Sequence, residues 1–122
     1  MSKTYEIGYF NDMKTSYFAK SAKNPNAVSI CLYSPTWYNG REYKKLAPEA
    51  RLLKKYKQDS DRVFYIEYYQ KSILDRLDPK QVYEELGENA ILLCWEKFGD
   101  FCHRHLVAQW LEKHLKITIC EL

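Results

Sequence analysis

Long apolar runs, a basic block and a signal-like start are all missing from this sequence. No stretch reaches the ~18 apolar residues that a membrane-spanning helix requires. Residues 1–8 show neither an apolar core nor a small-residue cleavage site, so nothing indicates export. The formal charge is +3, from 19 basic and 16 acidic residues spread along the chain, which supports nucleic-acid binding only weakly. These absences predict a cytoplasmic protein without a membrane partner, and they leave its oligomeric state open.

Cysteine is also scarce, with four residues at positions 31, 94, 102 and 120. They could make two disulfides, but a chain of 122 residues that is 46% apolar can bury a core without them. In the cytosol the default state is the reduced thiol. We therefore predict that Cys94 and Cys102 are free and close together, with Cys31 and Cys120 packed elsewhere.

The length fits one domain with one hydrophobic core. We divide it into an edge strand or extension (1–13), a core (14–115) and a terminal strand or tail (116–122). Within the core, strands alternate with helices, which predicts right-handed crossovers and a mainly parallel sheet flanked by helices. The expected fold class is thus a compact α/β domain of the Rossmann-like, three-layer type.

The clearest element is the strand Asn89–Cys94, a continuous apolar run of the kind that is covered on both faces. Between Ser34 and Pro48, two prolines and Asn-Gly predict a long ordered loop. The other predicted strands are Thr4–Phe10, Lys14–Phe18, Ala27–Tyr33 and Ile117–Ile119. Predicted helices run from Glu49 to about Lys57, from Arg62 to about Leu77 with Val63, Ile66, Ile73, Leu74 and Leu77 on the buried stripe, from Asp78-Pro79 to Leu86, and from Cys102 to about Leu115.

Several side chains that could take part in catalysis or binding lie in the segment Cys94–Arg104, where the predicted strand leads through a loop into the last predicted helix. Ligands of open parallel sheets lie beyond the carboxyl ends of the strands. The helix start and Arg104 predict a site for a small anion, such as a phosphate or carboxylate. The positive electrostatic field of the helix start and of Arg104 also favours the thiolate of Cys102. His103, the next residue, could carry protons to and from it.

Alternative interpretations stay open for these residues. Cys94 and Cys102 could simply be packed thiols, and His114 is best explained as a surface residue. Zinc could bind Cys94, Cys102 and either His103 or His105, but the spacing lacks the paired short intervals of structural zinc sites, so we predict no metal and no cofactor. The spacing also matches neither a P-loop, nor a dinucleotide fingerprint, nor the Cys-x5-Arg loop of tyrosine phosphatases.

The run Ala90–Leu111 (AILLCWEKFGDFCHRHLVAQWL) resembles the C-terminal signature of the domain of unknown function 488 family. Thr15–Lys20, Ser29–Pro35 and Tyr43–Pro48 resemble one branch of it, so the similarity covers roughly residues 14–114. It implies a compact α/β fold in an intracellular bacterial or phage protein, and brings no established reaction. Where the family often has Asp-Val-Arg, this chain has Ile30–Tyr33, so that arginine's role does not transfer.

Two functions from different classes follow. The first is an enzyme acting on a phosphorylated or nucleotide-like small molecule, with a thiolate from Cys102 or Cys94 and proton transfer by Glu96 or His103. The predicted ligand contacts are Arg104, Ser16, Tyr17, Trp37, Tyr38 and Tyr43, with Tyr17 and Trp37 stacking on a flat base and Tyr38, Arg41 and Tyr43 walling the pocket. The second is a non-catalytic module that grips a ligand or protein with the same pocket. A third interpretation makes the cysteines core residues and puts function on the tyrosine-rich surface.

Overall fold

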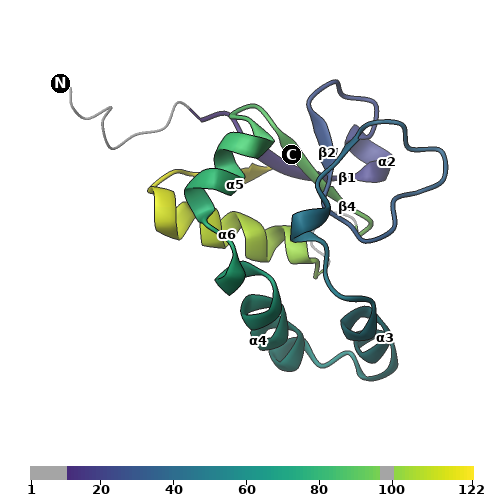
Figure 1. The fold of residues 1–122 in the computed structure, drawn as a ribbon. Helices are drawn as coiled ribbons and strands as arrows, with labels where there is room; N and C mark the ends of the chain where they lie inside the picture. Colours follow the sequence, from purple (N-terminus) through teal and green to yellow (C-terminus); the bar gives the residue numbers. More distant parts are fainter. Residues whose placement is uncertain (1–10, 97–100) are drawn as a thin grey trace.

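The computed structural model describes residues 11–96 and 101–122, in which the strands form one parallel sheet (Figure 1). The sheet has five strands in the order β3-β2-β4-β1-β5, and each pairing is parallel. The strands are β1 (Lys14–Tyr17), β2 (Ala27–Ser29), β3 (Arg41–Glu42), β4 (Ile91–Cys94) and β5 (Cys120–Glu121). The predicted α/β class is confirmed.

The strand β4 lies at the centre of the sheet, between β1 and β2. All its residues are buried, and Leu92, Leu93 and Cys94 have no exposed surface. This burial confirms the prediction of a central, buried parallel strand, although the strand begins at Ile91, one residue later than the predicted Ala90. Only a strand covered on both faces tolerates an unbroken apolar run.

Helices cover both faces of the sheet. The connections β1 to β2 and β4 to β5 cross it in opposite directions, so right-handed crossovers place their helices on opposite sides, as Figure 1 shows for α2 and α6. The helices are α2 (Phe18–Ser21), α3 (Ala50–Asp59), α4 (Arg62–Ser72), α5 (Pro79–Leu86) and α6 (His103–Leu115), with 3-10 turns at Lys44–Leu46 and Leu74–Arg76. None of those helices is both long and apolar enough to cross a membrane, as far as the described residues go.

The helices α3 and α4 form a hairpin that projects from the body beside the start of α6 (Figure 1). The predicted buried stripe of α4 is wrong at its start, because Val63 is 68% and Ile66 40% exposed. Tyr65 and Tyr69 are buried instead. Their rings bury more apolar area, and the Tyr69 hydroxyl donates to the Leu46 carbonyl at 2.6 Å, so the polar end is satisfied.

Several boundaries differ from the sequence-based expectation. Helix α4 ends at Ser72, whereas the sequence predicted an end near Leu77, and a 3-10 turn follows the helix. The strand β2 ends at Ser29, and β3 pairs with it inside the segment predicted as a loop. Both residues of β3 are exposed, so no apolar pattern could indicate a strand. The last strand is Cys120–Glu121 instead of Ile117–Ile119, and the predicted strand Thr4–Phe10 lies outside the described residues.

The boundaries of α5 follow the predicted local chemistry. The Asp78 side chain accepts from the Lys80 N–H at 3.1 Å, and Pro79 occupies the first turn. Gly87 ends the helix with a φ of 96°, which side chains rarely adopt. The helix therefore starts and stops where its sequence predicts.

Replacing Leu92 with alanine tests the central position of β4. The substitution removes buried methyl groups where neighbours on both faces cannot close the cavity. We expect the free energy of unfolding to fall by about 2–5 kcal/mol. The matched control is Val63→Ala on the exposed side of α4, for which chemical denaturation should show a change within about 0.5 kcal/mol. Equal effects of the two substitutions would contradict this architecture.

Candidate functional site

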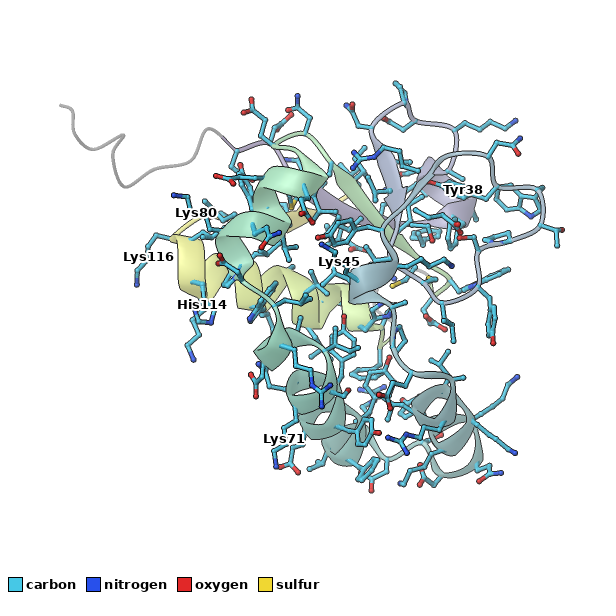
Figure 2. All side chains as sticks on the ribbon, viewed as in Figure 1. Tyr38, Lys45, Lys71, Lys80, His114 and Lys116 are labelled. Atoms are coloured by element: carbon cyan, nitrogen blue, oxygen red, sulfur yellow. The ribbon has the colours of Figure 1, made fainter. Side chains whose placement is uncertain are left out.

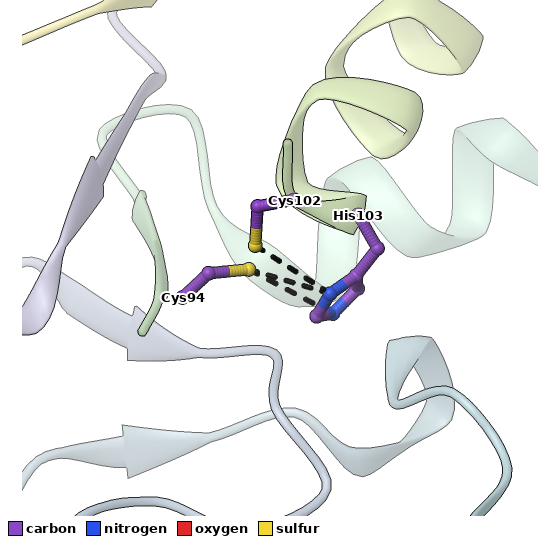
Figure 3. A group of neighbouring side chains, drawn as sticks. All are labelled: Cys94, Cys102 and His103. Atoms are coloured by element: carbon purple, nitrogen blue, oxygen red, sulfur yellow. Dashed lines mark hydrogen bonds between the residues drawn. The ribbon is translucent and has the colours of Figure 1, made fainter. Parts of the chain in front are cut away.

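The candidate site forms where β4 ends and α6 begins. Cys94 is the last residue of β4, Cys102 is the N-cap of α6, and His103 is its first residue. Figure 3 shows the two sulfur atoms facing one another and the imidazole ring. The two Sγ atoms and a ring nitrogen of His103 all lie within 4.8 Å of one another, and all three residues are buried.

The ring of His103 is held in one orientation by the backbone. Its Nε2 lies 2.7 Å from the carbonyl oxygen of Ile30. A carbonyl oxygen can only accept, so Nε2 carries a hydrogen and donates it. The other nitrogen, Nδ1, then faces the sulfurs, 3.4 Å from Cys94 Sγ and 3.8 Å from Cys102 Sγ. A neutral His103 therefore presents its basic nitrogen to the two thiols.

The thiolate of this cluster belongs on Cys102. Burial raises the pKa of that thiol, but hydrogen bonds from Cys94 and His103 and the charge on His103 outweigh it and hold the pKa well below its usual value. Cys94 lies closer to Nδ1, yet burial and the neighbouring Cys102 sulfur raise its pKa well above normal. Burial lowers the pKa of His103, but its hydrogen bond to Cys102 outweighs this and the net shift is upward. These directions favour a negative charge on Cys102, a positive charge on His103 and a neutral Cys94.

A third thiol adjoins the cluster, which corrects the expectation that Cys31 packs elsewhere. Because β2 and β4 are neighbours, Cys31 follows β2 at the same sheet edge where β4 delivers Cys94. A hydrogen bond from Cys94 lowers the pKa of Cys31. Cys120 is exposed on β5, so it is not packed as predicted. All four cysteines carry free thiols.

A pocket of about 150 Å³ opens beside Cys102 and His103. Its walls are mainly aromatic and aliphatic. The rings of Tyr56, Tyr65 and Phe101 pack together with centroids 5.2–5.4 Å apart. The other lining residues are Cys31, Leu32, Tyr33, Pro48, Leu53, Trp95 and Glu96. The helical hairpin α3–α4 thus supplies one wall. The segments that follow β2 and β4 supply the floor, and the start of α6 supplies the Cys102 thiol.

Glu96 brings a carboxyl group to the pocket. The residue is exposed as a whole, and it is one of the residues that line the pocket. Partial burial, the negative charge of Cys102 and a hydrogen bond to Cys102 raise the pKa of Glu96 to about 7. A carboxyl group with this pKa can donate and accept a proton near neutral pH.

Arg104 does not serve the pocket as an anion ligand. Its side chain has no exposed surface, and its NH2 lies 2.8 Å from Oε2 of Glu121. Its Nε donates to Oε1 of Glu121 at 3.1 Å and its NH1 to the Glu96 carbonyl at 2.7 Å. These contacts are those of the structural alternative, in which Arg104 ties α6 to β5 and to the segment after β4.

The other predicted ligand contacts also lie outside this pocket. The Ser16 and Ser21 hydroxyls are 2.7 Å apart inside the core, and Tyr17 ends β1 without lining the pocket. Trp37 and Tyr38 pack on Phe18 and line a separate hollow of about 650 Å³. Tyr38 lies far from α6 in Figure 2. The loop folds back on α2, so Tyr38 does not line the pocket beside Cys102.

Two further residues of that predicted wall bond to α5. The Arg41 guanidinium donates to the Leu86 carbonyl at 2.9 Å, and the Tyr43 hydroxyl donates to Glu85 at 2.5 Å. These bonds hold β3 and the residue that follows it against the end of α5. Both side chains therefore serve the packing of β3 on α5. His114 is exposed near the end of α6 (Figure 2), as its surface interpretation predicts.

The sequence did not indicate two parts of this site. The pocket wall is formed by Tyr56, Tyr65 and Phe101. From sequence alone, a tyrosine on a helix is equally well explained as a residue at the boundary between core and solvent. The carbonyl of Ile30 orients His103, and a backbone acceptor leaves no mark in the residue types. Spacing alone could have drawn attention to Tyr65 and Tyr69, which lie one turn apart on α4.

The cluster has the chemistry of a soft-metal site. Two thiols and an imidazole are ligands that Zn²⁺ prefers, and a tetrahedral zinc would set nitrogen and sulfur ligands about 3.6 Å apart. The distances from Nδ1 to the two sulfurs, 3.4 Å and 3.8 Å, bracket that separation. The three side chains therefore offer three of the four ligands of a tetrahedral site.

The fold and the site together define a parallel α/β protein with a cysteine–histidine centre at the carboxyl ends of its strands. A family model, DUF488-N3a, described as the active DUF488-N3 subclade, matches residues 14–115. The chain belongs to the DUF488 family. No curated protein and no solved structure matches it.

Replacing Glu121 with glutamine tests the ion pair with Arg104. Burial raises the Glu121 pKa, but bonds from Arg104 and Thr15 outweigh it and the net shift is downward. A lowered carboxyl pKa adds stability that is complete above the ordinary value of 4.5 and is lost as pH falls through the folded value.

We expect Glu121→Gln to reduce the free energy of unfolding at pH 7 by about 3 kcal/mol, the lower end for a broken buried pair. The difference should shrink as denaturation is repeated below pH 4.5. The control is Glu84→Gln on the exposed face of α5. A difference that stays constant with pH would show that the charge of Glu121 does not stabilise the fold.

Proposed function

We propose that this protein is an enzyme that uses the Cys102 thiolate as a nucleophile on a small molecule bound in the aromatic pocket. The observation that carries the proposal is the meeting of Cys102, His103 and Cys94 within 4.8 Å at the pocket floor. A nucleophile beside a base that is itself oriented by a third group is the general pattern of thiol catalysis. Here the orienting group is the Ile30 carbonyl.

The walls of the pocket favour a flat ring as the part of the substrate that binds. Tyr56, Tyr65 and Phe101 present aromatic surfaces to a space of about 150 Å³. A cavity of that volume takes a single aromatic ring. This supports the nucleotide-like class of substrate through its ring, whereas Arg104 offers no support for a bound phosphate because Glu121 occupies its fork.

Two groups can move protons in the proposed reaction. His103 Nδ1 faces Cys102 and takes its proton, which leaves the thiolate. Glu96 borders the same pocket with a pKa of about 7, so its protonated form can donate to a leaving group and its ionised form can activate water. The description of the matched family model as active is in keeping with an enzyme.

Alkylation rate tests the nucleophile and separates an enzyme from a binding module. In a Cys120→Ser background, we expect iodoacetamide to modify Cys102 about ten times faster than free cysteine at pH 7. The rate should stay high as pH falls toward 6, because the lowered pKa keeps the thiolate populated. Peptide mass mapping identifies the modified residue.

The control for this measurement is His103→Gln, whose amide can still donate to the Ile30 carbonyl but offers no base at Nδ1. It should bring the rate down to that of free cysteine. Zinc and other metals are assayed in the same samples by mass spectrometry, with and without a chelator. If Cys102 in the metal-free protein reacts no faster than free cysteine, a non-catalytic binding role replaces the proposal.

Paired electrophiles test the ring-binding part of the pocket. We expect N-phenylchloroacetamide to alkylate Cys102 at least about ten times faster than chloroacetamide, because a ring held beside the thiolate raises the local concentration of the electrophile. Tyr65→Leu should remove this preference while leaving the rate with chloroacetamide unchanged. Phe64→Leu, an exposed ring on the same helix, is the control. A preference that survives Tyr65→Leu would place the ring elsewhere.

A further inference from the structure

The cluster contains a feature that nucleophilic catalysis does not use, which is the second thiol of Cys94. That thiol is buried without exposed surface, so it cannot itself reach a substrate. Its sulfur nevertheless lies within 4.8 Å of the Cys102 sulfur. Figure 3 shows the two sulfur atoms side by side. A buried thiol this close to a thiol that lines a pocket is the geometry of a resolving and a reacting cysteine.

We propose that Cys102 and Cys94 form a redox pair, in which Cys102 reduces a small hydroperoxide and Cys94 then closes a disulfide with it. The proposal rests on the same nucleophilic Cys102 as the proposed function, but it needs no turnover of that substrate. The co-reactants are a hydroperoxide as oxidant and a low-molecular-weight thiol as reductant. The pocket gives such a peroxide access to Cys102, which lines it.

The first step breaks the O–O bond of the peroxide. The Cys102 thiolate attacks one oxygen, an S–O bond forms, and the sulfur loses two electrons to give a sulfenic acid. The other oxygen leaves as an alcohol, or as water from hydrogen peroxide, and takes its proton from His103. The imidazole is placed for this transfer because its Nδ1 lies 3.8 Å from Cys102 Sγ.

The second step forms the disulfide. The Cys94 sulfur attacks the oxidised Cys102 sulfur, an S–S bond forms, the S–O bond breaks, and water leaves with the Cys94 proton. Two equivalents of a small thiol then return both cysteines to the reduced form. Cys31 is the less suitable partner, because its Sγ donates to the Leu93 carbonyl at 3.6 Å and the group within 4.8 Å consists of Cys94, Cys102 and His103.

Peptide mapping after oxidation tests the pair. The metal-free full chain is treated with a slight excess of hydrogen peroxide at pH 7, denatured with N-ethylmaleimide and digested with trypsin. Lys97 lies between the two cysteines in the sequence, so they leave on separate peptides that only a disulfide can join. We expect the Cys94–Cys102 link as the main product, and its loss after dithiothreitol.

Variants separate the two steps. Cys94→Ser should stop at the Cys102 sulfenic acid, which dimedone traps, and Cys102→Ser should consume no peroxide above the level of free cysteine. Cys31→Ser and Cys120→Ser are controls that should keep the link. Circular dichroism establishes that each variant is folded.

The outcomes distinguish this proposal from the catalytic one. Rapid alkylation of Cys102 together with a missing Cys94–Cys102 link, or with a Cys31–Cys94 link instead, overturns the redox pair and leaves the nucleophile in place. Slow alkylation and no link overturn both. Slow alkylation with an efficient link at Cys94–Cys102 retains the redox pair and removes the proposed substrate chemistry.

Discussion

The ion pair of Arg104 with Glu121 holds the residues of the candidate site in position. One guanidinium binds the carboxylate on β5 and the carbonyl of Glu96 after β4, while its own residue lies in the first turn of α6. Because its side chain is fully buried, no solvent competes for these bonds. The start of α6 is therefore anchored to two strands, and Cys102 and His103, its neighbours in the sequence, are held against Cys94.

The same cation also stabilises the site electrostatically. The negative charge of Cys102 helps to raise the pKa of Arg104, and this attraction is mutual. The backbone N–H of Arg104 lowers the pKa of Cys102 as well, although Cys102 makes no side-chain capping hydrogen bond. The positive field predicted for this helix start thus acts on a group of the protein itself, because it favours the thiolate form of Cys102.

Sequence reasoning succeeded where the signal is local. The apolar run ending at Cys94 predicted the central strand, and Asp78, Pro79 and Gly87 predicted the limits of α5. It failed where the result depends on strand order, as for Cys31, which reaches the cluster because β2 lies beside β4. The partner of Arg104 was missed for the same reason. Glu121 belongs to β5, which pairs with β1 at the edge of the sheet and is separated from β4 by β1.

The apolar pocket wall matters for the charged pair at its floor. Attraction between the Cys102 thiolate and the His103 imidazolium grows as the surrounding medium becomes less polar. Tyr69 packs its ring 5.5 Å from that of His103, and Tyr65 and Phe101 close the adjoining space. The same wall penalises a lone buried charge, so the thiolate persists only while His103 is protonated or another donor replaces it. In the proposed reaction, proton transfer and thiol reactivity are therefore coupled by the burial that the α3–α4 hairpin provides.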